Sequence, residues 1–265
     1  MNQSPLWKTE VVVTALIGVL VLVAAGAGVF VPGFYQSTVD PEFLTGTITA
    51  DLVALLCVPL LGVCILGDRR GKLAARMIWV SLLVYLGYTS AVYAFDRMYT
   101  VLFPAYIILF SLCSFTVAIL VSRLDVAQVA SRLEKLRWRR ATASFLVFAG
   151  LILYVIELPI ILGRIPDGIQ AGGTPFMVLD MALVAPISIL TGVWLWQRRP
   201  WGAALTGIFL VKAVTLMTSF LIADYMNWFA GQLPDYGPTL AFTFVNVCAY
   251  YFVWNYFAAF KAVSK

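Results

Sequence analysis

Four ionisable side chains lie inside long apolar runs of this 265-residue sequence: Asp51, Glu157, Asp180 and Lys212. A charge at the centre of a membrane helix costs roughly 2.5–3.5 kcal/mol on insertion scales, so such residues usually face a partner or a wet cavity. Their chemistry could be charge pairing, proton exchange or ligand binding. Lys212 is the strongest candidate because it lies about 15 Å into its run, close to the middle of a bilayer.

These charges predict a polar pocket that opens outward, with Lys212 at its floor and acids neutralising it. The expected ligand-binding residues are the four ionisable side chains and two aromatic ones: Lys212, Asp180, Glu157, Asp51, Tyr85 and Tyr88. Each acid also has a purely structural explanation. Asp51 and Asp180 lie near predicted helix N-termini, where a carboxylate complements the helix dipole. Glu157 precedes Pro159, which frees a backbone carbonyl that water can reach.

Other site chemistry finds little support in the residue types. Histidine is absent, which removes the commonest general base and the usual haem and zinc ligand. The four cysteines all lie in apolar runs and none forms a CxxC pair, so they are typical of small packing residues. We therefore predict no catalytic residue, no metal site and no cofactor.

The elements that must position these residues are membrane helices. Hydrophobic residues make up 62% of the chain and charged residues 12%, with a mean hydropathy of +0.93. A soluble domain carries about 25% charged residues, so this chain lacks the polar sequence to coat a core. A helical span needs about 20 apolar residues. Eight runs qualify: 11–31, 47–67, 73–94, 100–121, 141–162, 175–196, 202–223 and 238–260.

Basic residues predict the orientation of these spans. With both termini in the cytoplasm, 15 of the 18 Lys and Arg residues fall in inner segments, as the positive-inside rule requires. Outer loops carry acids instead: Asp40, Glu42, Asp96, Asp167, Asp224 and Asp235. The net charge of +5 then describes orientation and contact with anionic lipid heads, not nucleic-acid binding. The first run resembles a secretory signal around Ala25-Gly26-Ala27, but its length favours a retained helix.

An internal duplication is the simplest account of the spacing. Asp51 and Asp180 each lie 18 residues before an Arg pair, and the offset between the two copies is 129 residues. This predicts an all-α bundle of four plus four helices, with parallel repeats over 1–125 and 141–265. At that offset the residue matching Lys212 is Leu83. Parallel repeats occur among transporters, with binding sites often at the repeat interface. Any two helices that end in Arg pairs would, however, look alike under the positive-inside rule.

The segment 126–140 joins the two halves. Val126, Val129, Ala130, Leu133 and Leu136 recur at helical spacing with charges between them. This pattern predicts a short amphipathic helix on the inner membrane surface, or alternatively a docking site for a partner.

Residues 180–186 (DMALVAP) and 197–202 (QRRPWG) resemble segments of bacterial multi-pass membrane proteins of uncharacterised function. The resemblance implies a bacterial cytoplasmic (inner) membrane and carries no activity with it.

Three functions stay open. A permease or ligand-binding protein for a small anionic or zwitterionic solute is favoured by the duplication and by Lys212. The second is a membrane enzyme that acts on lipids or lipid-linked substrates, with outer acids as general acid and base. The third is a non-catalytic subunit or sensor, packed within a homo-oligomer or against a partner membrane subunit through small residues such as Gly26 and Gly28.

Overall fold

The structure is a computed structural model that describes residues 5–134, 136–165, 174–231 and 236–261. It is 86% helix, and no strand occurs among the described residues. Seven helices in this part of the chain are long and apolar enough to cross a membrane. An all-helical apolar chain is compatible with a multi-pass integral membrane protein, because a helix satisfies its own backbone polar groups in lipid.

The membrane-length helices follow the order of the predicted spans. They are α1 (Pro5–Phe30), α2 (Pro41–Arg69), α3 (Leu73–Phe95), α4 (Phe103–Ser122), α6 (Arg139–Arg164), the continuous segment α7 (Thr174–Leu179), η1 (Asp180–Val184) and α8 (Ala185–Trp196), and α9 (Pro200–Phe229). The first seven predicted spans each coincide with one of them. The eighth falls on α10 (Tyr236–Lys261), a 26-residue helix that is not among the seven. The eighth crossing therefore stays a prediction.

Two helix ends share one hydrogen-bonding pattern. After α2, Gly71 is left-handed (φ +73°), and Gly71 N and Lys72 N donate to the carbonyls of Asp68 and Gly67. After α8, Arg198 is left-handed (φ +59°), and Arg198 N and Arg199 N donate to Leu195 and Trp194. This is the Schellman arrangement, which usually has glycine in the left-handed position because a side chain there is strained. Arginine takes the place of glycine in the second turn.

The chain divides into two compact units. The first comprises Met1–Leu124 and Val211–Tyr250, and the second comprises Asp125–Leu210 and Tyr251–Lys265. Helices α9 and α10 therefore contribute to both units. The predicted halves, 1–125 and 141–265, and their parallel repeat remain predictions.

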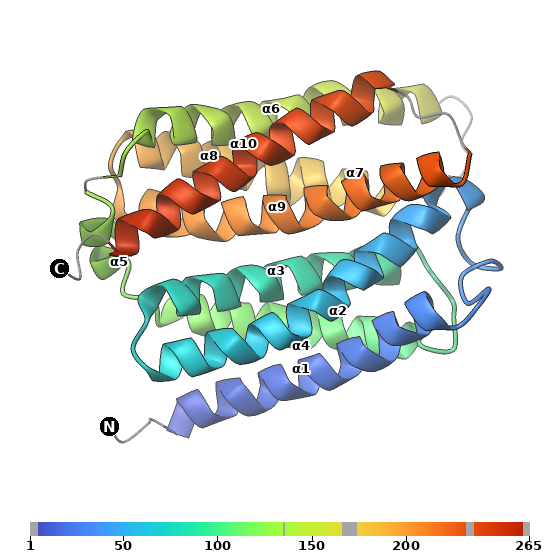
Figure 1. The fold of residues 1–265 in the computed structure, drawn as a ribbon, viewed down its shortest axis with the longest axis horizontal. Coiled ribbons are helices and arrows are strands. Elements are labelled where there is room, and N and C mark those ends of the chain that lie inside the picture. The colour runs from blue at the N-terminus through green and yellow to red at the C-terminus, as the bar shows by residue number, and fades with distance from the viewer. Residues whose placement is uncertain (1–4, 135, 166–173, 232–235, 262–265) are drawn as a thin grey trace. The chain divides into compact units, whose positions relative to one another are not determined.

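In the first unit, α1 packs on α2 and α4, and α3 packs on the same two helices (Figure 1). Helix α3 is the most buried of the membrane-length helices, because 67% of its apolar window is covered. Large apolar side chains on the other faces stay exposed, among them Val12, Val63 and Phe115. Apolar surface of this extent is typical of contact with lipid.

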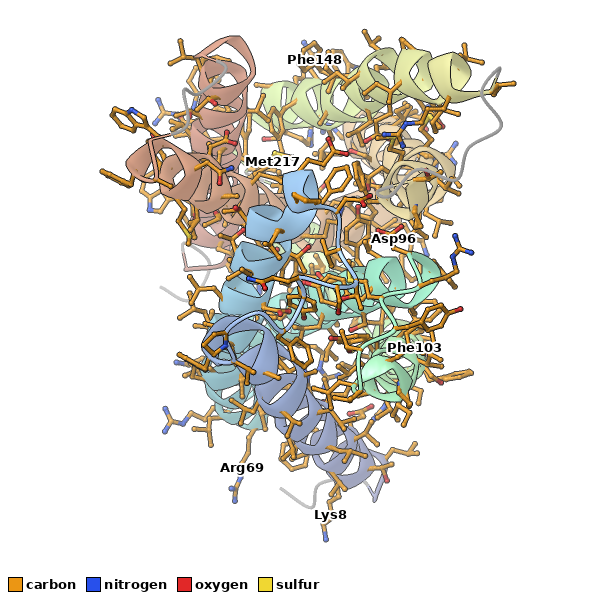
Figure 2. The ribbon with its side chains drawn as sticks, turned by 90° about the vertical axis from the view of Figure 1, so that its right-hand side faces the viewer. Lys8, Arg69, Asp96, Phe103, Phe148 and Met217 are labelled. Carbon is orange, nitrogen blue, oxygen red and sulfur yellow. The ribbon has the colours of Figure 1, made fainter. Side chains whose placement is uncertain are left out.

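Charged side chains gather at one end of the first unit. Glu10 of α1 pairs with Arg123, which follows α4, and Asp68 of α2 pairs with Arg76 of α3 at 2.8 Å. Trp7 Nε1 also donates to Asp68 Oδ2 at 2.9 Å. Lys8 and Arg69 project from this same end (Figure 2). The basic residues that the orientation rule assigns to the cytoplasm thus share one end of this unit.

In the second unit, α6 and α8 pack closely and antiparallel. A Cβ at Gly150 would lie 2.7 Å from Ala185 O, and one at Gly192 would lie 2.6 Å from Ala143 O. Ser188 Oγ donates to Leu146 O at 2.8 Å, so the contact continues between the two glycines. Small residues let helix backbones approach without apolar bulk between them, as is typical of membrane helix pairs.

The predicted linker helix is shorter than its segment. Helix α5 (Val126–Arg132) begins where Asp125 Oδ1 accepts a hydrogen bond from Gln128 N at 2.8 Å. Val129 and Leu133 are buried, in keeping with an amphipathic pattern. Four residues counted in the predicted charge asymmetry lie outside the described residues: Lys135, Asp167, Asp235 and Lys265.

Candidate functional site

Asp51 lies buried in the first unit with a tyrosine hydroxyl on each carboxylate oxygen. Tyr35 Oη donates to Asp51 Oδ2 at 2.7 Å, and Tyr93 Oη donates to Asp51 Oδ1 at 3.1 Å. Only 3% of Asp51 is exposed. A buried charge needs hydrogen bonds to offset its lost hydration, and bonds to a charged acceptor are stronger than neutral ones. The two phenols therefore stabilise a carboxylate at this position.

A third tyrosine extends the network. Tyr106 Oη lies 3.2 Å from Tyr35 Oη, and the rings of Tyr93 and Tyr106 meet edge to face with centroids 5.2 Å apart. The Tyr93 hydroxyl also lies 3.1 Å from Thr47 O, so its proton can be shared between this carbonyl and Asp51. We call Asp51, Tyr35, Tyr93 and Tyr106 the Asp51 cluster.

Four elements position this cluster. Asp51 comes from α2, Tyr93 from α3, Tyr106 from α4 and Tyr35 from the connection 31–40. Helix α1 contributes Gly28, where an added Cβ would lie 1.9 Å from Asp51 Oδ2 and 2.6 Å from Tyr35 Cε2. The cluster therefore requires glycine at position 28, since any other residue would occupy the space of the hydrogen bond.

A small cavity of about 20 Å³ adjoins Asp51, Tyr93 and Tyr106. That volume holds about one water molecule. Burial and the Asp51 carboxylate raise the pKa of the Tyr35 phenol well above its ordinary value, so Tyr35 stays a neutral donor. A carboxylate held this way can exchange a proton or accept a hydrogen bond from a cationic group.

Lys212 lies in the same unit and is equally buried, with 3% of the residue exposed. Its Nζ lies 4.1 Å from the centroid of the Tyr88 ring. A cation over an aromatic face gains about 2 kcal/mol or more when desolvated. Tyr88, which the sequence predicts as a ligand-binding aromatic, thus contacts Lys212, and its role in binding stays a prediction.

Tyr85, another predicted site residue, connects α3 with the turn of α2 that carries Asp51. Its hydroxyl donates to the carbonyl of Ala50, the residue before Asp51, at 3.1 Å. Tyr85 and Tyr88 are three residues apart, about 4.5 Å along the helix axis. Ala50, the neighbour of Asp51, and Lys212 therefore contact α3 within about one turn of each other, through Tyr85 and Tyr88.

The other two predicted site residues, Glu157 and Asp180, belong to the second unit and are each 6% exposed. Tyr154 Oη donates to Met181 O at 2.7 Å, which fixes the register of α6 against η1. Glu157 and Asp180 therefore lie within about one turn of each other along the helix axes. Both buried acids occupy one level of the second unit.

Asp180 begins a π-helical turn, in which Ala185 N donates to Asp180 O. Pro186 has no N–H, so the Met181 carbonyl has no donor within the helix. Tyr154 supplies that donor from α6. Turns of this type occur often at functional sites.

Sequence reasoning missed Tyr35, Tyr106 and Gly28. The two tyrosines carried a usable signal, because a phenol in an apolar setting needs a hydrogen-bond partner. Nothing in the sequence indicated which of the acids each would reach. Gly28 was interpreted as helix-packing surface, whereas a Cβ added there would meet Asp51 and Tyr35.

Metal binding has no candidate in the described part of the chain, where no three His, Cys, Asp or Glu side chains are grouped closely enough to hold an ion. The site is thus built from a carboxylate, an ammonium and tyrosines. Comparison of the chain with protein-family models, with curated proteins and with solved structures finds no match.

Proposed function

We propose that the protein is a membrane permease or ligand-binding protein for a small zwitterionic or anionic solute. The observation that carries this proposal is that Asp51 and Lys212 are both buried in one apolar unit against tyrosines of the same helix. Membrane helices retain buried charges of this kind mainly where they serve a solute or ion pathway.

The chemistry of the two groups favours a zwitterion. Lys212 would attract the carboxylate of the solute and Asp51 its ammonium group. The tyrosine hydroxyls would orient both, and the Tyr88 face would hold Lys212 in place when no solute is bound. An anionic solute would use Lys212 alone.

Solute entry requires movement at the Asp51 cluster, because the adjoining cavity holds about one water. Tyr35 is the group that would move. It lies on the connection 31–40 between α1 and α2 and covers one oxygen of Asp51. We propose that this end of the unit faces outward, and that the end with Lys8, Arg69 and Arg76 faces the cytoplasm.

A charge-matched ligand panel tests the proposal. The purified full chain in nanodiscs is titrated with L-alanine as zwitterion, propionate as anion and ethylamine as cation, and the shift in Tm is measured. We expect L-alanine to raise Tm and propionate to raise it less. Ethylamine should have no effect, since Lys212 repels it. Lys212→Met should abolish both shifts, and Asp51→Asn should reduce the L-alanine shift to that of propionate.

Two exposed residues provide matched controls. Lys72→Met removes a lysine at the charged end of the unit, and Asp40→Asn removes an acid whose side chain makes no capping hydrogen bond. Both variants should respond like the natural chain. Equal shifts in Lys212→Met and Lys72→Met, with both variants folded, would exclude Lys212 from binding and remove the basis of the proposal.

A further inference from the structure

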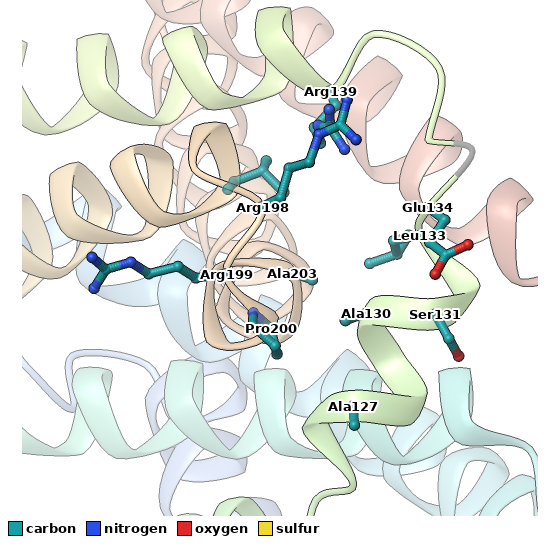
Figure 3. A pocket seen from close by; sticks show the side chains of 11 residues that line it. Ala127, Ala130, Ser131, Leu133, Glu134, Arg139, Arg198, Arg199, Pro200 and Ala203 are labelled. Carbon is teal, nitrogen blue, oxygen red and sulfur yellow. The ribbon is translucent and has the colours of Figure 1, made fainter.

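The second unit contains a pocket of about 580 Å³ that is separate from all the residues discussed above as a solute site (Figure 3). Its walls come from α5, the start of α6, the end of α8 and the start of α9. Sites for small molecules typically measure about 300–1,000 Å³. The pocket is therefore large enough for a ligand, which the cavity beside Asp51 is not.

Two arginines give one side of this pocket its positive charge. The side chains of Arg139 and Arg198 converge at one side, whereas Arg199 points away and Glu134 lies across the pocket on the α5 side (Figure 3). Neither Arg139 nor Arg198 forms a salt bridge with any described residue. The Nε of Arg139 is buried and has no hydrogen-bond partner in the described part of the chain. Two converging guanidinium groups and an unused buried donor favour a bound anion.

The backbone holds Arg198 at the pocket despite strain. Arg198 occupies the left-handed position of the α8–α9 turn, where Gly71 stands in the α2–α3 turn. A side chain in that conformation costs about 1–2 kcal/mol relative to glycine. Backbone strain of this kind clusters at functional sites. The strain adds a second observation to the converging charges.

We propose that this pocket binds a phosphate group through Arg139 and Arg198. Guanidinium groups form paired hydrogen bonds with phosphate oxygens, and a planar fork suits a tetrahedral anion better than the point charge of lysine. The phosphate could belong to a lipid headgroup or to a free ion. Basic pockets between membrane helices on the cytoplasmic side are a recurring form of headgroup site.

The surroundings fit a position at the membrane interface. Arg140 and Arg199 each lie 6.0 Å from a tryptophan ring, those of Trp196 and Trp194. Tryptophan is enriched at the level of lipid headgroups. These neighbouring arginines therefore have aromatic partners, while Arg139 and Arg198 present their charge to the pocket.

Binding is measured on the full chain in detergent, by change in Tm and by titration. One arm uses inorganic phosphate, and the other uses dihexanoyl-phosphatidylglycerol below its micellar concentration. We expect saturable binding in at least one arm. Response to the lipid alone identifies a headgroup site, and response to both identifies a site for the phosphate group itself; either outcome supports the proposal.

Arg139→Gln and Arg198→Gln should each weaken binding about tenfold or more, as expected for loss of a charge-assisted hydrogen bond. Arg137→Gln is the control, because Arg137 is exposed in the same linker, stacks on Trp138 and does not line the pocket. Arg198→Gly also removes the Arg198 guanidinium, and it relieves the strain of the left-handed backbone. This variant stays informative if Arg139→Gln does not fold.

Absence of binding in both arms would overturn the proposal. So would equal weakening by Arg137→Gln, which would indicate a diffuse basic surface rather than a site. Unchanged binding in folded Arg198→Gly would exclude the pairing of the two arginines. None of these results bears on the solute panel, since that panel depends on residues of the first unit.

Discussion

Helix α2 and the segment α7–η1–α8 carry the same landmarks but use them differently. Pro186 lies 127 positions after Pro59, and the left-handed residue Arg198 lies 127 positions after Gly71. Asp180, however, lies 129 positions after Asp51. The prolines and turns therefore correspond, whereas the aspartates are two residues out of step.

The turns therefore offer a second possible offset beside the 129 residues predicted from the Arg pairs, and the repeat itself remains a prediction. Arg69 is the last helical residue of α2, whereas Arg198 lies beyond the end of α8. An offset of 127 anchored on the turns would match Lys212 with Tyr85, whereas the predicted offset of 129 matches it with Leu83. Charge pattern alone does not decide between the two offsets, because basic residues are selected at every inner turn, whatever their exact place in it.

The comparison also shows two ways to support a buried acid near a proline. In α2 the chain stays α-helical through Pro59, and tyrosines from other elements reach the carboxylate of Asp51. In the second segment the helix widens at Asp180, and Tyr154 reaches a backbone carbonyl instead. Irregular backbone is tolerated within a membrane where neighbouring side chains replace its lost hydrogen bonds.

Gly28→Ala should cause the largest loss of stability among the substitutions that test this comparison. Its methyl group would occupy the position of Asp51 Oδ2, so we expect a loss of about 3 kcal/mol in unfolding free energy. The measurement is thermal or chaotrope unfolding in detergent. Gly26→Ala on the same helix is the control, because nothing lies within 4 Å of a Cβ there. Equal stability of the two variants would show that the Asp51 cluster does not constrain α1.

Tyr154→Phe should remove the hydroxyl that donates to Met181 O and cost about 1–3 kcal/mol, the penalty for a buried acceptor left without a hydrogen bond. Tyr225→Phe, at an exposed tyrosine of α9, should leave the unfolding free energy nearly unchanged. A loss below about 0.5 kcal/mol for Tyr154→Phe would mean that the π-helical turn needs no support from α6.

Substitutions in the two turns should change the unfolding free energy in opposite directions. Gly71→Ala should cost about 1–2 kcal/mol through its left-handed φ alone, since a Cβ at Gly71 meets no other atom within 4 Å. Arg198→Gly, without ligand, should stabilise the fold by about 1 kcal/mol. Destabilisation by Arg198→Gly would show that Arg198 contributes to stability as well as to the proposed pocket.

The last predicted effect, absent at neutral pH, should appear only at high pH. The folded-state pKa of Tyr35 is raised, so above about pH 10 the unfolded phenol ionises while the folded one stays neutral. The contribution of Tyr35 to the unfolding free energy is then fully present below about pH 10. Above that pH it falls by up to about 1.4 kcal/mol per pH unit. Unfolding curves from pH 8 to 11 should show that fall in the natural chain relative to Tyr35→Phe. Parallel curves would mean that Tyr35 titrates normally.

The helices were largely predictable from the sequence. Backbone polar groups must be satisfied within the segment that crosses lipid, so apolar runs of about 20 residues define helices almost by length alone. Seven predicted spans coincide with membrane-length helices, and the linker pattern coincides with α5. Asp51 and Lys212 were also recognisable as unusual, because a charge in an apolar run stands out, although their role in a site stays a prediction.

What the sequence could not supply is which side chains meet. Helices such as α1 and α4 are apolar on every side, so their patterns do not reveal which face turns inward. Only the packing brings Tyr35, Tyr93 and Tyr106 to Asp51, and only the tertiary register of α6 provides Tyr154 for Met181. The left-handed Arg198 was equally hidden, since glycine was the residue expected in that position. Span positions follow from local hydropathy, whereas these contacts depend on helix rotation and register, which packing between helices decides.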